Sequence, residues 1–246
     1  MKARVRWAIL GVGAAVMTSA AAGAPSVLRR MDSFAVHRVE IRGTHMMAAY
    51  AALKQSGITR KSSVFDDFAP WRARLLKHPM VLDATIERRL PSTIRITITE
   101  TSPVALARTP DLTPVDARGR ALPVDPATVD LDVPVLAMTS HPDAAGRFVD
   151  SATISTVRIL AALERRDARL FSWVSEAGAL RGDGVRLGLR SPAGAEAFVA
   201  SDPRALRLNE LQVALADLAA RGELSRLERI DARFHDQIVV ALKNGK

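Results

Sequence analysis

The chain has 246 residues, of which 48% are hydrophobic and 25% charged, and this composition is typical of a folded protein with a substantial core. It contains no cysteine, which excludes a disulfide framework, a thiolate zinc site, an iron–sulfur cluster and a cysteine nucleophile. The net charge is +9, but residues 1–30 hold five basic residues and no acidic one, which leaves a mildly basic body. Because no basic cluster interleaved with aromatic residues follows, the sequence does not favour binding of nucleic acid.

The N-terminal thirty residues are typical of a segment that directs a chain to a membrane. Residues 7–28 are uncharged and would span roughly 33 Å as a helix, enough for a bilayer core of about 30 Å. We therefore expect a single transmembrane helix over 7–28, preceded by a short cytoplasmic tail, residues 1–6. The small residues at 20–24 also suit the cleavage site of a signal peptide, and this alternative stays open. In either case the rest of the chain is expected to be exported.

Residues 34–100 predict a small α+β unit in the order β-α-α-β-β. In its last strand, isoleucines alternate with polar residues, which indicates one buried face and one face in water. Gly57 is expected to end the first helix, and Pro79 to stop the second. The expected elements are a strand over 34–42, helices over 45–55 and from about 66 to 77, and strands over 80–89 and 93–100.

Residues 102–246 predict a mixed, β-rich domain with two helices. Turn signals at 116–119 and 182–184 indicate hairpins. The expected strands cover 104–108, 133–138, 171–176, 179–181, 185–190, 226–234 and 237–243, and the expected helices cover 151–170 and 203–221.

A search for catalytic or metal-binding patterns finds none. The five histidines lack the spacing that places two imidazoles on one metal ion, and no common nucleophile or phosphate-binding motif is present. Glu100 ends an apolar strand, where we expect a salt bridge rather than an acid–base role. Trp71 and His78 are expected to serve packing and capping. The sequence therefore predicts no catalytic residue, no cofactor and no metal site.

Several short segments, in this order and spacing, resemble the FtsQ (DivIB) family of bacterial division proteins. They are residues 36–43, 78–81, 86–94 and 100–105, which resemble its POTRA domain, and residues 115–119 and 230–234, which resemble its β domain. The resemblance implies a POTRA domain over 34–101 and an FtsQ-type β domain over 102–246. The expected fold class is thus α+β, with the single N-terminal transmembrane helix, the small POTRA domain and the mixed β-rich domain.

The same resemblance implies a non-catalytic division scaffold. Such a protein is bitopic, lies in the cytoplasmic (inner) membrane with its N-terminus inside, and places its main body on the periplasmic side. Its implied partners are FtsB- and FtsL-like division proteins, and its implied role is to help regulate septal peptidoglycan synthesis. Neither a nucleic acid nor a small-molecule substrate is expected.

The last expected strand is a candidate for partner binding. Residues 237–242 are mostly hydrophobic and stand near the end of the sequence, so no later strand in the sequence covers them. An uncovered strand at a sheet edge offers unpaired N–H and C=O groups to a partner strand, whereas an interior strand does not. Both placements stay open at this point. In the edge case, Val239→Pro should remove a donor of the ladder and abolish binding.

The resemblance assigns roles to particular residues at this end of the chain. Phe234 would be an aromatic anchor, and Arg190 would meet an acidic partner. Ile238, Val240 and Leu242 would fix the face of the strand. The predicted partner-binding residues are Arg190, Phe234, Gln237, Ile238, Val239, Val240, Ala241 and Leu242.

Two other classes of protein are weighed against the division scaffold. A POTRA-containing exported factor in outer-membrane protein assembly or secretion would usually carry several POTRA units or a large barrel. The sequence shows one such unit and few strands. A periplasmic hydrolase with an unrecognised site is the third alternative.

Overall fold

The computed structural model describes residue 28 and residues 31–109, 111–137 and 140–243. The described chain divides into two compact units, the first ending at Glu100 and the second beginning at Thr101. Each unit has its own β-sheet: three strands in the first and eight in the second.

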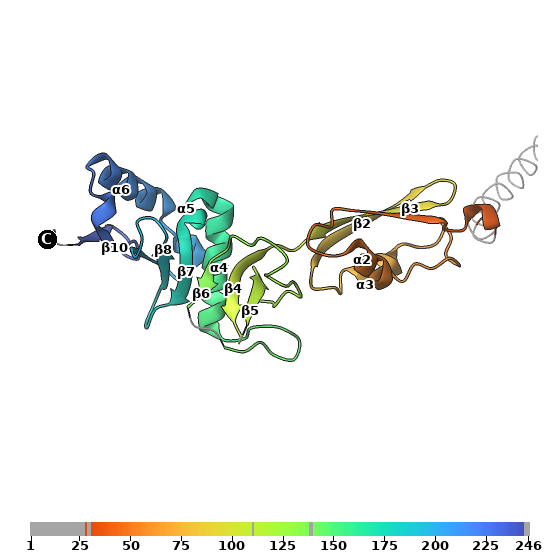
Figure 1. Ribbon diagram of the computed structural model, residues 1–246, viewed down its shortest axis with the longest axis horizontal. Coiled ribbons are helices and arrows are strands. Elements are labelled where there is room, and N and C mark those ends of the chain that lie inside the picture. The colour runs from red at the N-terminus through yellow and green to blue at the C-terminus, as the bar shows by residue number, and fades with distance from the viewer. Residues whose placement is uncertain (1–27, 29–30, 110, 138–139, 244–246) are drawn as a thin grey trace, which may run out of the picture. The chain divides into compact units, whose positions relative to one another are not determined.

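The first unit confirms the predicted β-α-α-β-β order. After a short 3-10 turn at Asp32–Phe34, its elements are β1 (Arg38–Arg42), α2 (Ala49–Ser56), α3 (Ala69–Leu75), β2 (Val81–Arg89) and β3 (Thr93–Glu100). The sheet has the order β1-β3-β2, with β1 parallel and β2 antiparallel to the central β3. Both helices pack on one face of this sheet (Figure 1).

The core of the first unit follows the alternation of β3. Ile94, Ile96 and Ile98 are almost fully buried, and Leu75 and Trp71 of α3 are buried as well. Burial also lowers the pKa of the His78 imidazole. The packing role expected for Trp71 is confirmed.

Both helices of the first unit are shorter than predicted. The backbone N–H groups of Met46 and Met47, which were expected inside a helix, each donate at 2.8 Å to the carboxylate of Glu100. These bonds hold residues 46–47 outside the helix, and α2 begins only at Ala49. The prediction of a salt bridge for Glu100 is therefore wrong. In the described part of the chain, its carboxylate accepts hydrogen bonds from backbone amides instead.

The second unit contains a mixed sheet with helices against it. Its strand order is β11-β10-β9-β8-β7-β6-β4-β5. The strands are β4 (Pro103–Arg108), β5 (Leu112–Asp116), β6 (Val135–Leu136), β7 (Val174–Ala179), β8 (Val185–Leu189), β9 (Glu196–Val199), β10 (Leu227–Asp231) and β11 (Val239–Leu242). The helical segments are α4 (Ser151–Arg166), α5 (Ala168–Trp173), α6 (Leu208–Ala220) and two 3-10 turns, η2 (Pro203–Ala205) and η3 (Leu224–Arg226).

The main core lies between the helices and one face of this sheet. The α4 helix packs across β4, β7 and β8, and it contributes fully buried Val157 and Leu160. The α6 helix presents a stripe of leucines at helical spacing, which includes Leu211 and Leu218.

Several sequence predictions in the second unit need correction. The helix expected over 151–170 is two helices, because Asp167 leaves the helical conformation and its side chain caps α5 through the N–H of Leu170. The unit therefore has three α-helices, not two. No separate strand forms over 179–181, and residues 171–173 of the strand expected over 171–176 belong to α5. The helix expected over 203–221 begins only at Leu208, after the turn η2, and neither β5 nor β9 was predicted.

The transmembrane part of the expected fold class is also corrected. No helix in the described part of the chain is long and apolar enough to cross a membrane. The longest, α4, has 16 residues and ends in two arginines, whereas a membrane span needs about 20 apolar residues. The expected span over 7–28 and the tail over 1–6 lie outside the described residues, except for Leu28.

Candidate partner-binding edge

The β11 strand forms one edge of the eight-stranded sheet. It pairs antiparallel with β10, with Val240 opposite Ile230 and Val239 opposite Asp231. No strand in the described part of the chain pairs with its outer side. The interior placement left open by the sequence is therefore excluded for β11.

The direction of each backbone group in β11 follows from one hydrogen bond. The N–H of Lys243 donates to the carbonyl of Arg226 at 2.8 Å, so the backbone of Lys243 faces β10. Since backbone groups alternate in direction along a strand, Val239 and Ala241 also face β10. The N–H and C=O groups of Val240 and Leu242 then face away from the sheet.

The opposite edge of the same sheet, β5, is protected in two ways. Pro114 stands within β5, and proline lacks the N–H that a partner strand needs. The carbonyl of Pro114 also accepts a hydrogen bond from the N–H of Leu122 at 2.8 Å, and Val115 forms an isolated bridge with Ala121. The two edges therefore differ: β5 is closed to a partner strand and β11 is open.

The side chains of β11 are divided between the core and solvent. Ile238 and Leu242 are partly buried against the core of the second unit. Val239 and Val240 are exposed at 45% and 37%. Two adjacent exposed valines on an open edge strand give a partner strand apolar contacts as well as backbone groups.

Two arginines hold the β10–β11 hairpin at its two ends. At the turn, Nη1 of Arg207 donates to the carbonyl oxygens of Phe234 at 2.6 Å and Gln237 at 3.1 Å. At the open end, Nη2 of Arg226 donates to the carbonyl of Lys243 at 3.2 Å. Arg207 stands at the N-terminus of α6, so this helix fixes the turn that leads into β11.

An aromatic and charged cluster lies beside this turn. The guanidinium groups of Arg229 and Arg233 each lie 5.4 Å from the ring centre of Phe198. Arg233 also donates to both carboxylate oxygens of Asp231, at 2.9 and 2.7 Å. The Arg233 guanidinium holds the pKa of the Asp231 carboxyl below its usual range, chiefly through these hydrogen bonds.

The predicted site residues do not all gather at this edge. Gln237, Ile238, Val239, Val240, Ala241 and Leu242 lie in β11 or directly before it, and Phe234 lies in the preceding turn, 43% exposed. Arg190 lies at the end of β8, and β9 and β10 separate β8 from β11. Its guanidinium forms an ion pair with Asp132 at 2.6 Å and donates to the carbonyl of Val174. The structure therefore does not place Arg190 with the edge residues.

Sequence reasoning missed the residues that support the edge. Arg207 is 27 positions from Phe234 in the sequence, and no local pattern joins them. Asp231 and Arg233 could have been found, because residues two apart on an extended chain lie on the same side. The predicted effect of Val239→Pro is also revised: the Val239 N–H faces β10, so proline there would disrupt the hairpin itself.

Comparisons with known proteins agree with this architecture. Residues 34–101 match the family described as the FtsQ-type POTRA domain. The chain is also 25% identical over 244 residues to the cell division protein FtsQ of Syntrophotalea carbinolica, a match that covers 97% of this chain and 84% of the relative. The chain is thus similar to FtsQ proteins over most of its length and to their POTRA domain over residues 34–101.

The likeness to an FtsQ-type POTRA domain and to an FtsQ protein suggests a role in cell division. The comparisons do not favour the alternative of a factor in outer-membrane protein assembly. Within the described residues, no group of three or more metal-ligating side chains comes together. We take the open β11 edge as the candidate site.

Proposed function

We propose that this FtsQ-type chain is a non-catalytic division scaffold that binds FtsB- and FtsL-like partners through the β11 edge. In this role it helps to regulate septal peptidoglycan synthesis without catalysing it. The observation that carries the proposal is the contrast between the two sheet edges, since β5 is blocked by Pro114 and β11 is open. An open edge offers unpaired backbone groups, so an edge strand that no described segment covers supports pairing with a partner strand.

The proposed contact combines backbone and side-chain interactions. A partner strand would pair with the N–H and C=O groups of Val240 and Leu242, each hydrogen bond contributing roughly 0.5–1.5 kcal/mol. Such bonds alone give little affinity and no sequence preference. The exposed side chains of Val239 and Val240, with Phe234 at the turn, supply the apolar contacts that select the partner. The predicted edge residues thus stay in the proposal, and Arg190 is left out of it.

The backbone contribution can be tested with one substitution and a matched control. Val240→Pro removes an N–H that faces the partner and keeps the hairpin bonds of Val239 and Ala241. Val240→Ala keeps that N–H and shortens the side chain. We expect Val240→Pro to abolish binding to the purified FtsB/FtsL-like pair, and Val240→Ala to weaken it by less than about tenfold. Titration calorimetry measures both affinities.

The same variants should differ in dividing cells. Val240→Pro in place of the native chain should give filaments that lack septa, while Val240→Ala should divide. Retained affinity of Val240→Pro, with its far-UV circular dichroism unchanged, would reject the edge as the partner site.

We further infer the roles of the two domains from the family resemblance. Residues 34–101 act as the POTRA domain and residues 102–246 as the β domain that carries the docking edge. The likeness to an FtsQ protein supports our inference of a place at the inner membrane, and we propose that the folded units lie on the periplasmic side.

A further inference from the structure

One end of the first unit brings together three segments that lie apart in the sequence. We call it the hairpin end, and it consists of residues 31–38, 60–67 and 87–92. The N–H of Val36 donates to the carbonyl of Ser62 at 2.8 Å, which joins the first segment to the second. The N–H of His37 donates to the carbonyl of Ser92 at 2.9 Å, which joins the first segment to the third. Side chains of all three segments therefore share one surface region.

The hairpin end exposes apolar side chains to solvent. Leu90 stands in the connection between β2 and β3, at the tip of their hairpin, and is 62% exposed. Pro91 beside it is exposed as well. Met31 directly precedes the turn η1 (Asp32–Phe34) and is 47% exposed. The hairpin tip therefore presents hydrocarbon that would gain free energy by leaving water.

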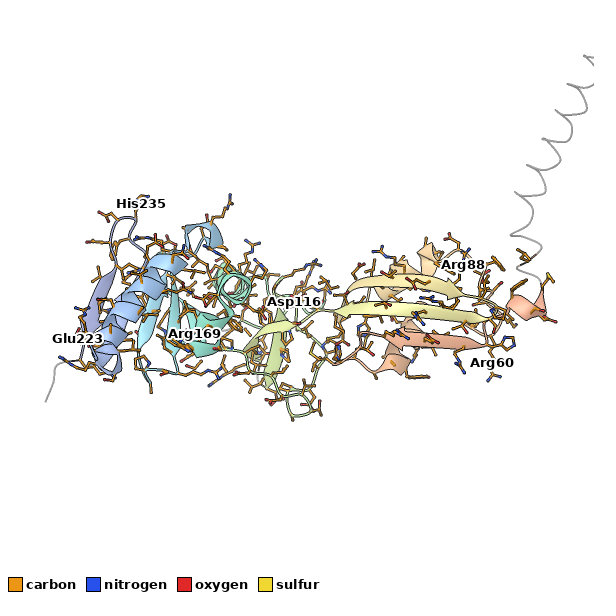
Figure 2. All side chains as sticks on the ribbon, turned by 90° about the horizontal axis from the view of Figure 1, so that it is seen from above. Arg60, Arg88, Asp116, Arg169, Glu223 and His235 are labelled. Carbon is orange, nitrogen blue, oxygen red and sulfur yellow. The ribbon has the colours of Figure 1, made fainter. Side chains whose placement is uncertain are left out.

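Basic side chains lie at the same end as this apolar tip. Arg60 and Lys61 are exposed, and among the described residues neither of them forms an ion pair with a carboxylate. The Arg88 guanidinium lies 5.6 Å from the ring centre of Phe65 and 5.0 Å from that of Phe68. Figure 2 shows Arg60 and Arg88 toward the end of the first unit that carries η1.

The carboxylates of the hairpin end are mostly engaged within the chain. Asp66 and Asp67 each accept a hydrogen bond from a backbone N–H, at 2.8 and 2.9 Å. Glu87 pairs with Arg89 at 3.2 Å, and Asp32 is exposed. The exposed cations of this end are therefore available to bind an anionic surface.

The neighbouring sequence indicates which anionic surface this is. Residues 7–28 are uncharged and typical of a segment that directs a chain to a membrane, and Arg29 and Arg30 stand between them and Met31. The hairpin end thus follows directly on the part of the sequence that suits a membrane. An exposed apolar tip with basic side chains beside it is complementary to anionic lipid, because hydrocarbon enters the headgroup region while cations meet the phosphates. A bilayer is therefore favoured over a protein partner at this end.

We propose that the hairpin end of the first unit docks on a bilayer that contains anionic lipid. Leu90 enters the headgroup region, and Arg60 and Lys61 face lipid phosphates. The proposal rests on the membrane location in the proposed function and is independent of the β11 edge. Each basic residue near an anionic surface strengthens such docking by about fivefold, and the inserted side chain adds an apolar contribution. Docking would restrict the orientations that the first unit adopts at the membrane.

A fluorescent label at the hairpin tip tests the proposal in the full-length protein. Because the chain has no cysteine, Leu90→Cys carries a single environment-sensitive dye. Leu82→Cys is the matched control, since Leu82 is 48% exposed at the opposite end of β2. The labelled proteins are reconstituted in vesicles of phosphatidylcholine with or without phosphatidylglycerol. With phosphatidylglycerol, we expect the dye at position 90 to shift to shorter wavelength and to be quenched by a lipid-attached quencher, and the dye at position 82 to show neither effect.

A charge reversal tests the electrostatic part of the contact. Lys61→Glu in the labelled Leu90→Cys protein should lower the ratio of docked to undocked tip by about fivefold or more, and the loss should shrink as salt is raised. Lys77→Glu makes the same charge change at an exposed position that follows α3, near the start of β2, and should leave the ratio unchanged. Far-UV circular dichroism and thermal unfolding of each variant verify that it is folded.

The outcomes separate this proposal from the β11 edge. Equal signals from positions 90 and 82, or the same signal at position 90 with and without phosphatidylglycerol, would reject docking on anionic lipid. A signal at position 90 that requires the FtsB/FtsL-like pair instead of anionic lipid would assign the hairpin end to a protein and also reject the proposal. Leu90→Asp should bind that pair normally, and Val240→Pro should leave the signal at position 90 unchanged, so that failure of either contact is seen by itself.

Discussion

At the residue scale, Gly43 and Glu100 fix the path of the chain out of β1. Gly43 has φ +77°, and a Cβ atom there would lie 2.1 Å from the carbonyl oxygen of Ile98. Only glycine allows both the left-handed conformation and this close approach. The chain then passes Glu100, whose carboxylate binds the amides of Met46 and Met47. These two residues account for an extended stretch where helical spacing alone predicts a helix.

Asp231 should make the stability of the second unit depend on pH. The hydrogen bonds from Arg233 lower its pKa in the folded state, so its contribution is full above the ordinary aspartate pKa near 4 and is lost as the pH falls through the lowered value. We expect Asp231→Asn to destabilise the unit at pH 7 by about 1 kcal/mol and to flatten the acid side of its stability profile. Urea unfolding between pH 2.5 and 7 measures both effects.

Arg233→Gln provides the matching experiment for the same pair. It removes the donor that lowers the Asp231 pKa. The free energy of unfolding should therefore depend less on pH at the acid end, as in Asp231→Asn. If the free energy of unfolding of both variants falls with acid pH as steeply as that of the native chain, this role of the ion pair is contradicted.

At the element scale, the two edge strands of the large sheet differ in how their unpaired backbone groups are protected. The β5 strand carries Pro114 and is covered by residues 121–122, whereas β11 contains no proline and no strand of the described part of the chain covers it. An edge strand that binds a partner should already be ordered before binding. Ordering a mobile strand during binding would cost conformational entropy and weaken the affinity. The hairpin is held at its ends by Arg207 and Arg226.

Arg207 should therefore control the order of the docking strand. Arg207→Ala removes two hydrogen bonds to the turn carbonyls and should speed hydrogen exchange of the β11 amides by about tenfold or more. Arg204→Ala is the matched control, since its side chain is 95% exposed and pairs only loosely with Asp202. Exchange followed by mass spectrometry reads the peptide over 232–243. Equal exchange in the two variants would show that α6 does not hold the strand.

At the scale of the whole molecule, each unit has a sheet and buried residues of its own. Ile94, Ile96 and Ile98 are buried in the first unit, and a separate cluster that includes Leu160, Leu187 and Leu211 forms the core of the second. The open edge belongs entirely to the second unit. The proposed docking function is thus expected to depend on the core of the second unit.

The inferred location can be tested because the chain has no cysteine. Val213→Cys introduces one thiol on the outer face of α6, where valine is 70% exposed. In spheroplasts with an intact inner membrane, a membrane-impermeant maleimide should label this variant and leave the native chain unlabelled. The labelled protein should sediment with the inner membrane. Labelling only after lysis would contradict a periplasmic position of the second unit.

Local sequence patterns predicted the elements whose identity depends on neighbouring residues. The alternation of isoleucines predicted β3 with its observed bounds, and the turn at 182–184 correctly placed the hairpin between β7 and β8. Gly57 and Gly222 follow α2 and α6 as expected, each with a positive φ. The break at Asp167 escaped prediction because the leucine spacing continues across it, while the side-chain cap that ends one helix and begins another gives no periodic signal.

The sequence by itself determined the β-α-α-β-β order of the first unit, the hydrophobic character of β11 and the resemblance to FtsQ. Those features depend on residue type and spacing along the chain. Only the tertiary structure decided that β11 is an open edge, that its Val240 faces outward, that Arg190 is held elsewhere by Asp132, and that residues 60–61 lie at the same end of the first unit as the β2–β3 hairpin tip. Strand order and the grouping of surface residues depend on contacts between residues far apart in sequence, and the same local pattern is compatible with several such arrangements.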